Sequence, residues 1–169
     1  MSGASDRVRR ASGAQPSRAR RAWVLAAAVL LLDQASKHWA LQQLGPGVIQ
    51  PFIPGLLQLQ RVANTGAAFS LLSGNTALLG LISAVASLGL AGWLLLRPPS
   101  GLWTILAAGF LLGGTLGNGL DRWRLGWVVD FLELVPVRFP IFNLADVAIN
   151  LAVLCFLIDL LRPTRAADA

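Results

Sequence analysis

The chain has 169 residues, carries a formal net charge of +6, and is 55% hydrophobic with only 13% charged residues. An average soluble domain carries about 25% charged residues, so the composition excludes an ordinary soluble domain and indicates a single membrane-embedded one. The basic residues lie beside apolar runs and not on a face with stacking aromatics, which excludes nucleic acid as a partner and favours membrane topology as their explanation.

The N-terminal region combines a basic segment with an apolar run. Six arginines lie within the first 21 residues, and residues 1–22 offer little to bury, so we predict a disordered basic tail. The apolar run 23–32 after it fits a cleaved signal peptide, but residues 33–37 are a poor small-residue cleavage site. We therefore predict a retained first membrane span over about residues 22–42.

The next segment, up to the second apolar run, has a different character. Helix-breaking prolines and glycines occur between Pro46 and Gly55. Residues 57–62 then alternate between apolar and polar side chains, which is typical of a strand. This pattern predicts a small sheet lying at a membrane surface.

Three further spans are predicted from long apolar runs. Residues 76–96 carry no charge, and at about 1.5 Å per residue they cross a bilayer of about 30 Å. A polar turn at 97–100 leads to a second run over 101–120. Residues 121–141 are mixed, with Pro136 and Pro140 as helix breakers. The last span is predicted over about 142–161 and contains several polar residues.

Four spans place both chain ends in one compartment. The tail 1–22, the turn with Arg97 and the end segment with Arg162 and Arg165 hold nine of the fourteen basic residues. The positive-inside rule makes this compartment the cytoplasm. We therefore expect residues 1–22 and 163–169 to be cytoplasmic tails, and residues 43–75 and 121–141 to lie on the outer, periplasmic side.

The chain has a single cysteine, Cys155, and a single histidine, His38, which limits the disulfide and metal-binding chemistry that it can support. Cys155 has no second cysteine for an intrachain disulfide, and it lies in an apolar run like a small buried hydrophobe. One cysteine and one histidine fall short of the set that holds zinc. We expect no metal and no other cofactor.

Two acidic residues in apolar surroundings have basic neighbours. Asp33 and Lys37 are spaced i, i+4, which places them on one helix face in the favourable order, so we predict an ion pair that fixes the first span. Asp121 is followed directly by Arg122, but adjacent side chains diverge on a helix. Arg122 is therefore expected to serve another acid or a carbonyl within a structural network.

Asp130 and Asp146 have no such neighbour, and the prolines between them allow the chain to turn back. Two carboxyl groups in contact share a proton, because both cannot ionise easily. The ionised group can then take a proton from water while the protonated group donates to a scissile carbonyl. The alternatives from spacing alone are buried hydrogen-bonded acids and an ion or proton pathway.

Small and amide residues accompany these acids. Asn64, Asn118 and Asn143 can donate to a carboxylate or to a peptide carbonyl without adding charge. Gly113 and Gly117 have the spacing of a flat helix face, which usually packs closely against another helix.

Five short blocks carry a resemblance to a known family: DQASK at 33–37, NTGAAF at 64–69, GGTLGNGLDR at 113–122, VVDF at 128–131 and FNLAD at 142–146. In this order and spacing, over about residues 22–162, the chain resembles the lipoprotein signal peptidases (signal peptidase II, aspartic peptidase family A8).

The resemblance implies a fold and a function. The expected fold is an all-α bacterial inner-membrane protein with four transmembrane helices, a small periplasmic β-cradle over 46–63, and a short periplasmic helix after Arg122 that covers the site. The expected activity is removal of signal peptides from diacylglyceryl-modified prolipoproteins on the amino side of the lipidated cysteine, by a monomer that globomycin-type antibiotics inhibit. It places the catalytic dyad at Asp130 and Asp146, with substrate-binding or supporting roles for Asn64, Gly66, Asn118, Arg122, Asn143, Asp33, Lys37 and Asp121.

Two other functions compete with a peptidase when the residues alone are considered. A small transporter or proton channel would use Asp33, Asp130 and Asp146 as a relay and would show proton flux in liposomes. A non-catalytic assembly factor would use the same acids only for packing, so replacing Asp130 would change stability and no product.

Overall fold

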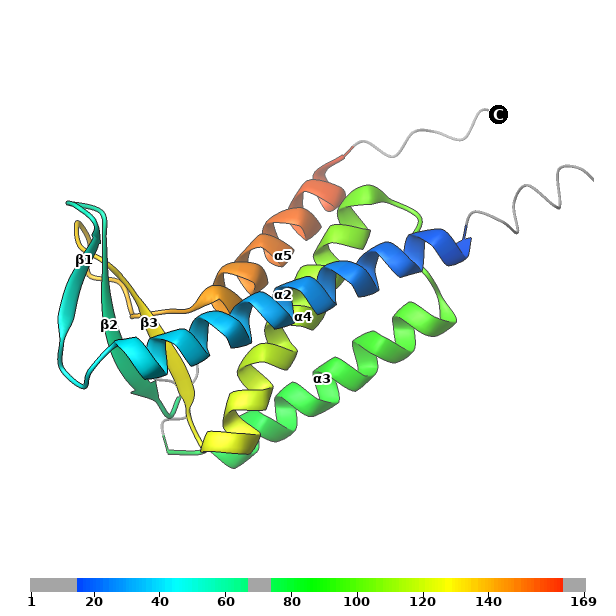
Figure 1. Ribbon diagram of the computed structural model, residues 1–169. Helices are drawn as coiled ribbons and strands as arrows, with labels where there is room; N and C mark the ends of the chain where they lie inside the picture. The colour runs from blue at the N-terminus through cyan, green and yellow to red at the C-terminus, as the bar shows by residue number, and fades with distance from the viewer. Residues whose placement is uncertain (1–14, 67–73, 163–169) are drawn as a thin grey trace, which may run out of the picture.

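The structure is a computed structural model that describes residues 15–66 and 74–162. Four long helices and one three-stranded antiparallel sheet make up the fold. In Figure 1 the helices run side by side, the sheet lies at one end, and the start of the first helix and the end of the last lie at the other. In chain order the elements are α2 (Gln15–Gln43), β1 (Ile49–Ile53), β2 (Leu57–Asn64), α3 (Thr76–Leu96), α4 (Leu102–Leu125), β3 (Val128–Leu134) and α5 (Leu144–Leu161).

Helix α4 is the centre of the bundle and packs against α2, α3 and α5. Its glycines allow this close approach. A Cβ atom added at Gly113 would lie 2.7 Å from the carbonyl oxygen of Ala26 in α2, and one at Gly114 would lie 2.7 Å from that of Ala145 in α5. The prediction that the glycine face serves helix packing is confirmed.

The sheet packs against the C-terminal end of α2. Its order is β1-β2-β3, and Ala63 of β2 pairs with Val129 of β3. One face of the sheet forms a buried cluster with the end of α2, made by Ala40, Leu44, Leu59, Val129 and Phe131. Successive side chains of a strand point to opposite faces, so Asp130, between two residues of this cluster, points to the other face. The core of the sheet therefore aims Asp130 at the bundle axis.

The sequence-based prediction of a sheet is confirmed, but its extent was underestimated. The third strand, β3, comes from residues expected to belong to a connection with a short helix. The expected short helix after Arg122 is wrong, because α4 continues to Leu125 and ends at Gly126, whose φ of 80° is left-handed. Residues 128–134 then form a strand. The expected helical protein with a small sheet is therefore confirmed, and a third strand stands where the short helix was expected.

The prediction of a disordered tail over residues 1–22 is also wrong in part. Helix α2 begins at Gln15 and continues the first apolar run toward the N-terminus. Arginine and alanine are good helix formers, so the basic segment extends the helix. The rest of the tail and residues 163–169 lie outside the described residues.

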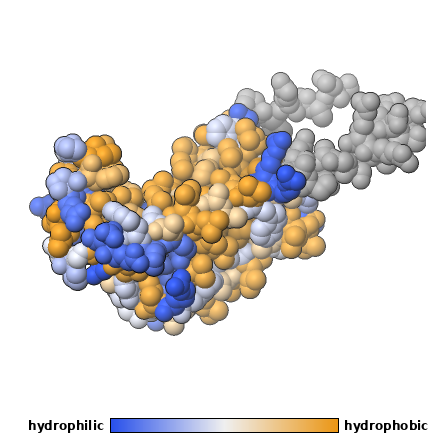
Figure 2. Space-filling model, in the orientation of Figure 1, coloured by the Kyte–Doolittle hydropathy of each residue, from blue (hydrophilic) through white to orange (hydrophobic). Residues whose placement is uncertain are grey.

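Three of the described helices, α3, α4 and α5, are long and apolar enough to cross a membrane. Helix α2 is long enough but carries the polar residues Asp33, Gln34 and Lys37 in its middle, which lower its hydropathy. Figure 2 shows the hydrophobic surface concentrated over the helices, with hydrophilic residues around the sheet. The fourth crossing, by α2, remains a prediction.

Candidate active site

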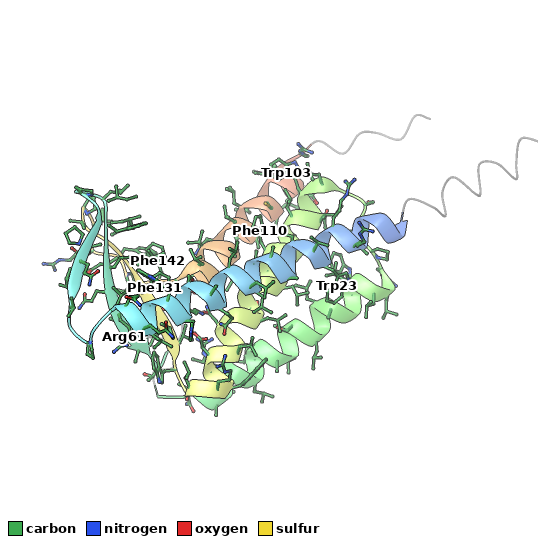
Figure 3. The ribbon with its side chains drawn as sticks, viewed as in Figure 1. Trp23, Arg61, Trp103, Phe110, Phe131 and Phe142 are labelled. Carbon is green, nitrogen blue, oxygen red and sulfur yellow. The ribbon has the colours of Figure 1, made fainter. Side chains whose placement is uncertain are left out.

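The two carboxylates expected to act together come from different elements that meet at one residue, Asn143. Asp130 lies on β3, and Asp146 lies in the first turn of α5. The Asn143 side-chain amide donates to Asp130 Oδ1 over 2.6 Å, and its backbone N–H donates to Asp146 Oδ2 over 3.2 Å. Figure 3 shows Phe131 and Phe142, the neighbours of this pair, where β3 meets the start of α5.

Local sequence explains why Asn143 occupies this place. It is the N-cap of α5, and its Oδ1 accepts from the backbone N–H of Asp146 over 2.9 Å. Together with the bond from the Asn143 N–H to the Asp146 carboxylate this is a capping box, which satisfies two helix-end donors reciprocally. The residue that starts the last helix therefore also holds both carboxylates.

Two further amides complete the contacts of the carboxylates. Asn118 of α4 donates from Nδ2 to Asp146 Oδ1 over 2.8 Å. Asn64, at the end of β2, donates from Nδ2 to Asp130 Oδ2 over 2.8 Å. The three asparagines predicted to accompany the acids all contact them, so the hydrogen bonds that hold the pair come from neutral donors.

The orientation of the Asn118 amide is determined by a lysine. Lys37 Nζ donates to Asn118 Oδ1 over 2.9 Å, and Asn143 Nδ2 donates to the same oxygen over 3.1 Å. An ammonium group has no acceptor, so this end of the amide must be the oxygen. The NH₂ end of Asn118 consequently faces Asp146.

Lys37 also sits between two buried acids. Its Nζ lies 2.9 Å from Asp33 Oδ2 and 3.0 Å from Asp121 Oδ2, and all three side chains are at most 4% exposed. The predicted i, i+4 pair of Asp33 and Lys37 is confirmed. Asp121 pairs with Lys37, and its neighbour Arg122 turns elsewhere.

The two acids in turn hold the backbone next to the candidate dyad. Asp33 Oδ1 accepts from the backbone N–H of Ala145 over 2.9 Å, and Asp121 Oδ2 accepts from that of Val129 over 3.0 Å. Each contact is one residue before a candidate catalytic aspartate. The ion network therefore positions the start of α5 and the middle of β3.

Arg122 contacts carbonyl groups. Its Nη2 donates to the carbonyl oxygen of Gly66 over 3.0 Å, and the N–H of Gly66 donates to Asn64 Oδ1 over 2.8 Å. Within residues 15–66 and 74–162 Arg122 forms no salt bridge, so its charge acts on Asp146 and Asp130 only from a longer range. The Nε–H of Arg122 is buried without a hydrogen-bond partner in the same part of the chain.

Burial and charge combine to hold a proton on Asp130. The residue is 2% exposed. Burial, and then the charge of Asp146, raise the pKa of Asp130 to about 7, against smaller opposing effects of the hydrogen bonds from Asn64 and Asn143 and of the Lys37 charge. A carboxyl group with this pKa can donate a proton near neutral pH while a partner carboxylate accepts one.

One residue of the network was missed in the sequence. Gln34 donates from Nε2 to Asp121 Oδ1 over 3.1 Å and to the carbonyl oxygen of Gly117 over 3.2 Å, so it links α2 to α4 beside the ion network. An amide directly after Asp33 inside an apolar span was the available signal, because polar residues in such spans need partners.

Comparison with known proteins agrees with this arrangement. The family model described as signal peptidase (SPase) II matches residues 25–162. The chain belongs to the signal peptidase II family. The match includes every residue of the polar network described above, from Asp33 to Asp146.

Relatives of this signal peptidase II chain are similar over nearly their full length. The lipoprotein signal peptidase of Synechococcus sp. (strain RCC307) is 58% identical over 146 residues, which are 85% of this chain and 97% of the relative. That of Gloeobacter violaceus (strain ATCC 29082 / PCC 7421) is 44% identical over 147 residues, 87% of this chain and 85% of the relative.

Solved structures share the fold. A bacterial membrane enzyme determined by the in meso method at 2.3 Å resolution superposes with a TM-score of 0.80 at 28% identity, over 88% of this chain and 93% of that one. A second, at 1.9 Å resolution, gives a TM-score of 0.76 at 30% identity over 85% and 94%. Family membership and the apolar helices make this signal peptidase II a bacterial membrane peptidase.

Proposed function

We propose that this signal peptidase II is an aspartic endopeptidase that removes signal peptides from diacylglyceryl-modified prolipoproteins, on the amino side of the lipidated cysteine. The observation that carries the proposal is the contact of Asn143 with both Asp130 and Asp146. Two acids held at one residue, without a cation of their own among the described residues, suit a pair that shares one proton.

The proposed reaction uses the pair as acid and base. Ionised Asp146 takes a proton from a water molecule, and the water oxygen bonds to the scissile carbonyl carbon. Protonated Asp130 donates its proton to the carbonyl oxygen, so a neutral tetrahedral intermediate forms. The intermediate collapses when the C–N bond breaks and the leaving amine takes a proton from Asp146. One hydroxyl group of the intermediate returns its proton to Asp130 in the same step. The signal peptide leaves as an acid, the lipidated cysteine leaves as an amine, and both aspartates regain their starting protonation.

The amides and Arg122 support this chemistry by position. Asn64 and Asn118 hold the carboxylates through fixed donors, which cost little reorganisation when charge moves in the transition state. Arg122 donates a hydrogen bond from α4 to the carbonyl oxygen of Gly66. Its buried Nε–H has no hydrogen-bond partner among the described residues. We propose that this donor orients the substrate main chain.

Topology supports a site near the outer face of the membrane. The start of α2, the turn between α3 and α4 and the end of α5 lie at the end of the bundle opposite the sheet. These segments carry Arg20, Arg21, Arg97 and Arg162, as the positive-inside rule expects of a cytoplasmic end. With α2 as the fourth span, both termini are cytoplasmic and the sheet is periplasmic. A lipid-anchored cysteine in the outer leaflet then reaches the carboxylates laterally, and a monomer suffices.

The decisive experiment is cleavage of a defined substrate by the purified protein. A diacylglyceryl-modified prolipoprotein is incubated with the wild type, Asp130→Asn and Asp146→Asn, and the products are weighed by mass spectrometry. We expect one cut before the modified cysteine, inhibition by globomycin, persistence in strong chelator, and a loss of at least ~10³-fold in either variant. Asp159→Asn, whose carboxylate accepts from Thr104 at the far end of the bundle, serves as the control. Wild-type turnover by either dyad variant refutes the mechanism.

A further inference from the structure

Asn150 is an exposed amide on the side of α5 that faces away from its buried residues. The residues that α5 buries are Ala145, Ala148, Ala152 and Cys155, and Asn150 points away from them. Its neighbours on the helix surface are apolar and exposed, including Leu151 at 38% and Leu154 at 52%. An amide in hydrocarbon is costly unless its polar atoms are hydrogen-bonded.

The described part of the chain satisfies only some of the hydrogen-bonding groups of this amide. Asn150 Nδ2 donates to the carbonyl oxygen of Asp146 over 2.9 Å, and this is the single hydrogen bond of the side chain within the described residues. A primary amide has two N–H donors and a carbonyl acceptor. One N–H and the oxygen are therefore without a partner among residues 15–66 and 74–162.

The position of Asn150 relates it to the candidate dyad. It follows Asp146 by four residues on one helix, so the two side chains lie on the same face, one above the other. Four residues of helix rise by about 6 Å, and the rise from Asp146 to Asn150 leads away from the sheet, into the bundle's apolar zone. A substrate that is cut at Asp146 and anchored in the membrane passes Asn150 at this depth.

We propose that Asn150 is a binding residue for the diacylglyceryl group, donating its free N–H to an ester carbonyl of the lipid. This inference rests on the proposed function. About seven covalent bonds separate the scissile nitrogen from the nearer ester carbonyl carbon, so at about 1.5 Å per bond and with a bent chain the carbonyl reaches some 6–9 Å. That span matches the rise from Asp146 to Asn150.

Other groups of the substrate fit the amide less well. The backbone carbonyls of a helical signal peptide are already bonded within their own helix, and acyl chains have no acceptor. Ester carbonyls are unpaired acceptors carried by the substrate to this depth. Asn150 thereby selects a lipidated cysteine over an unmodified one by a hydrogen bond as well as by apolar contact.

The test pairs a change in the enzyme with a change in the substrate. Wild type and Asn150→Leu are each assayed for kcat/KM on a diacylglyceryl prolipoprotein and on its dialkylglyceryl ether analogue, which lacks both carbonyls. For the wild type we expect kcat/KM to be about two- to tenfold higher on the ester substrate than on the ether, because one hydrogen bond contributes about this factor. For Asn150→Leu this ratio falls to one, with the change mainly in KM.

Two control variants distinguish loss of the hydrogen bond from a change in the shape of the α5 surface. Leu151→Ala alters an exposed neighbour on α5 and is expected to keep the wild-type ester-to-ether ratio, and Asn150→Gln, which retains the amide, keeps part of it. An equal ratio for wild type and Asn150→Leu overturns the inference, as does a variant that changes only the oligomeric state. Absence of cleavage of either substrate by the wild type instead overturns the proposed function.

Discussion

Asn143 contacts Asp130 through its side chain, at 2.6 Å, and Asp146 through its backbone N–H, at 3.2 Å. The residue that caps α5 thus contacts both carboxylates. Because Asp130 belongs to β3 and Asp146 to α5, the relative position of the two carboxylates depends on Asn143 more than on either element alone.

Replacement of Asn143 by alanine should uncouple the pair. We expect Asn143→Ala to lower kcat/KM by at least ~100-fold, because Asp130 loses its shortest contact and Asp146 loses its cap partner. Loss of an N-cap side chain should also destabilise the protein by about 0.5–2 kcal/mol. Asn64→Ala, which removes one donor from Asp130 only, should cost less activity and little stability. Equal effects of the two variants on activity would contradict this role of Asn143.

The raised pKa of Asp130 predicts a pH-dependent stability with a definite sign. Between the ordinary pKa of 3.8 and the folded-state value of about 7, the folded state holds a proton that the unfolded state has lost. The stabilisation is complete below 3.8 and is lost as pH rises through about 7, with a slope of at most about 1.4 kcal/mol per pH unit.

Asp130→Asn should remove this contribution. The measurement is unfolding in detergent across pH 4–8, and the quantity compared is the difference between wild type and variant. A difference that stays constant over this range, or grows with pH in favour of the wild type, would show that Asp130 is ionised throughout.

Removal of Lys37 should destabilise the bundle as well as impair the site. Lys37→Met leaves Asp33 and Asp121 buried without their cation, a change that costs about 3–5 kcal/mol, and it frees Asn118 to turn its oxygen toward Asp146. The unfolding temperature and the peptidase activity should both fall. Arg124→Gln, at an exposed arginine of α4, should leave both unchanged, and a stable Lys37→Met protein would contradict the account of the network.

A single methyl group at Gly117 should disturb the same network. A Cβ there would meet the Asp33 carboxylate and would lie 3.3 Å from Ala145 Cβ, so Gly117→Ala should destabilise the protein by about 1–3 kcal/mol. Gly89→Ala is a matched control in α3, where an added Cβ meets nothing within 4 Å. Because alanine favours helix over glycine by about 1 kcal/mol, this control should be neutral or more stable. Similar unfolding temperatures for the two variants would refute the close approach.

The sequence alone predicted the family and part of the fold. The apolar runs predicted the positions of the spans, since hydropathy is local, and the i, i+4 spacing predicted the pair of Asp33 and Lys37. Asp130 and Asp146 stood out because neither had a basic neighbour. The resemblance of five blocks to the signal peptidase II family was confirmed by comparison.

Only the tertiary structure decided which groups meet. Lys37 pairs with Asp121 across 84 positions and holds Asn118, and the cation beside Asp121 in sequence contacts the Gly66 carbonyl instead. Strand β3 replaced an expected helix because its pairing with β2 satisfies backbone groups that a short connection would leave open. Such partners come from elements far apart in the chain, and spacing along one helix or strand carries no information about them.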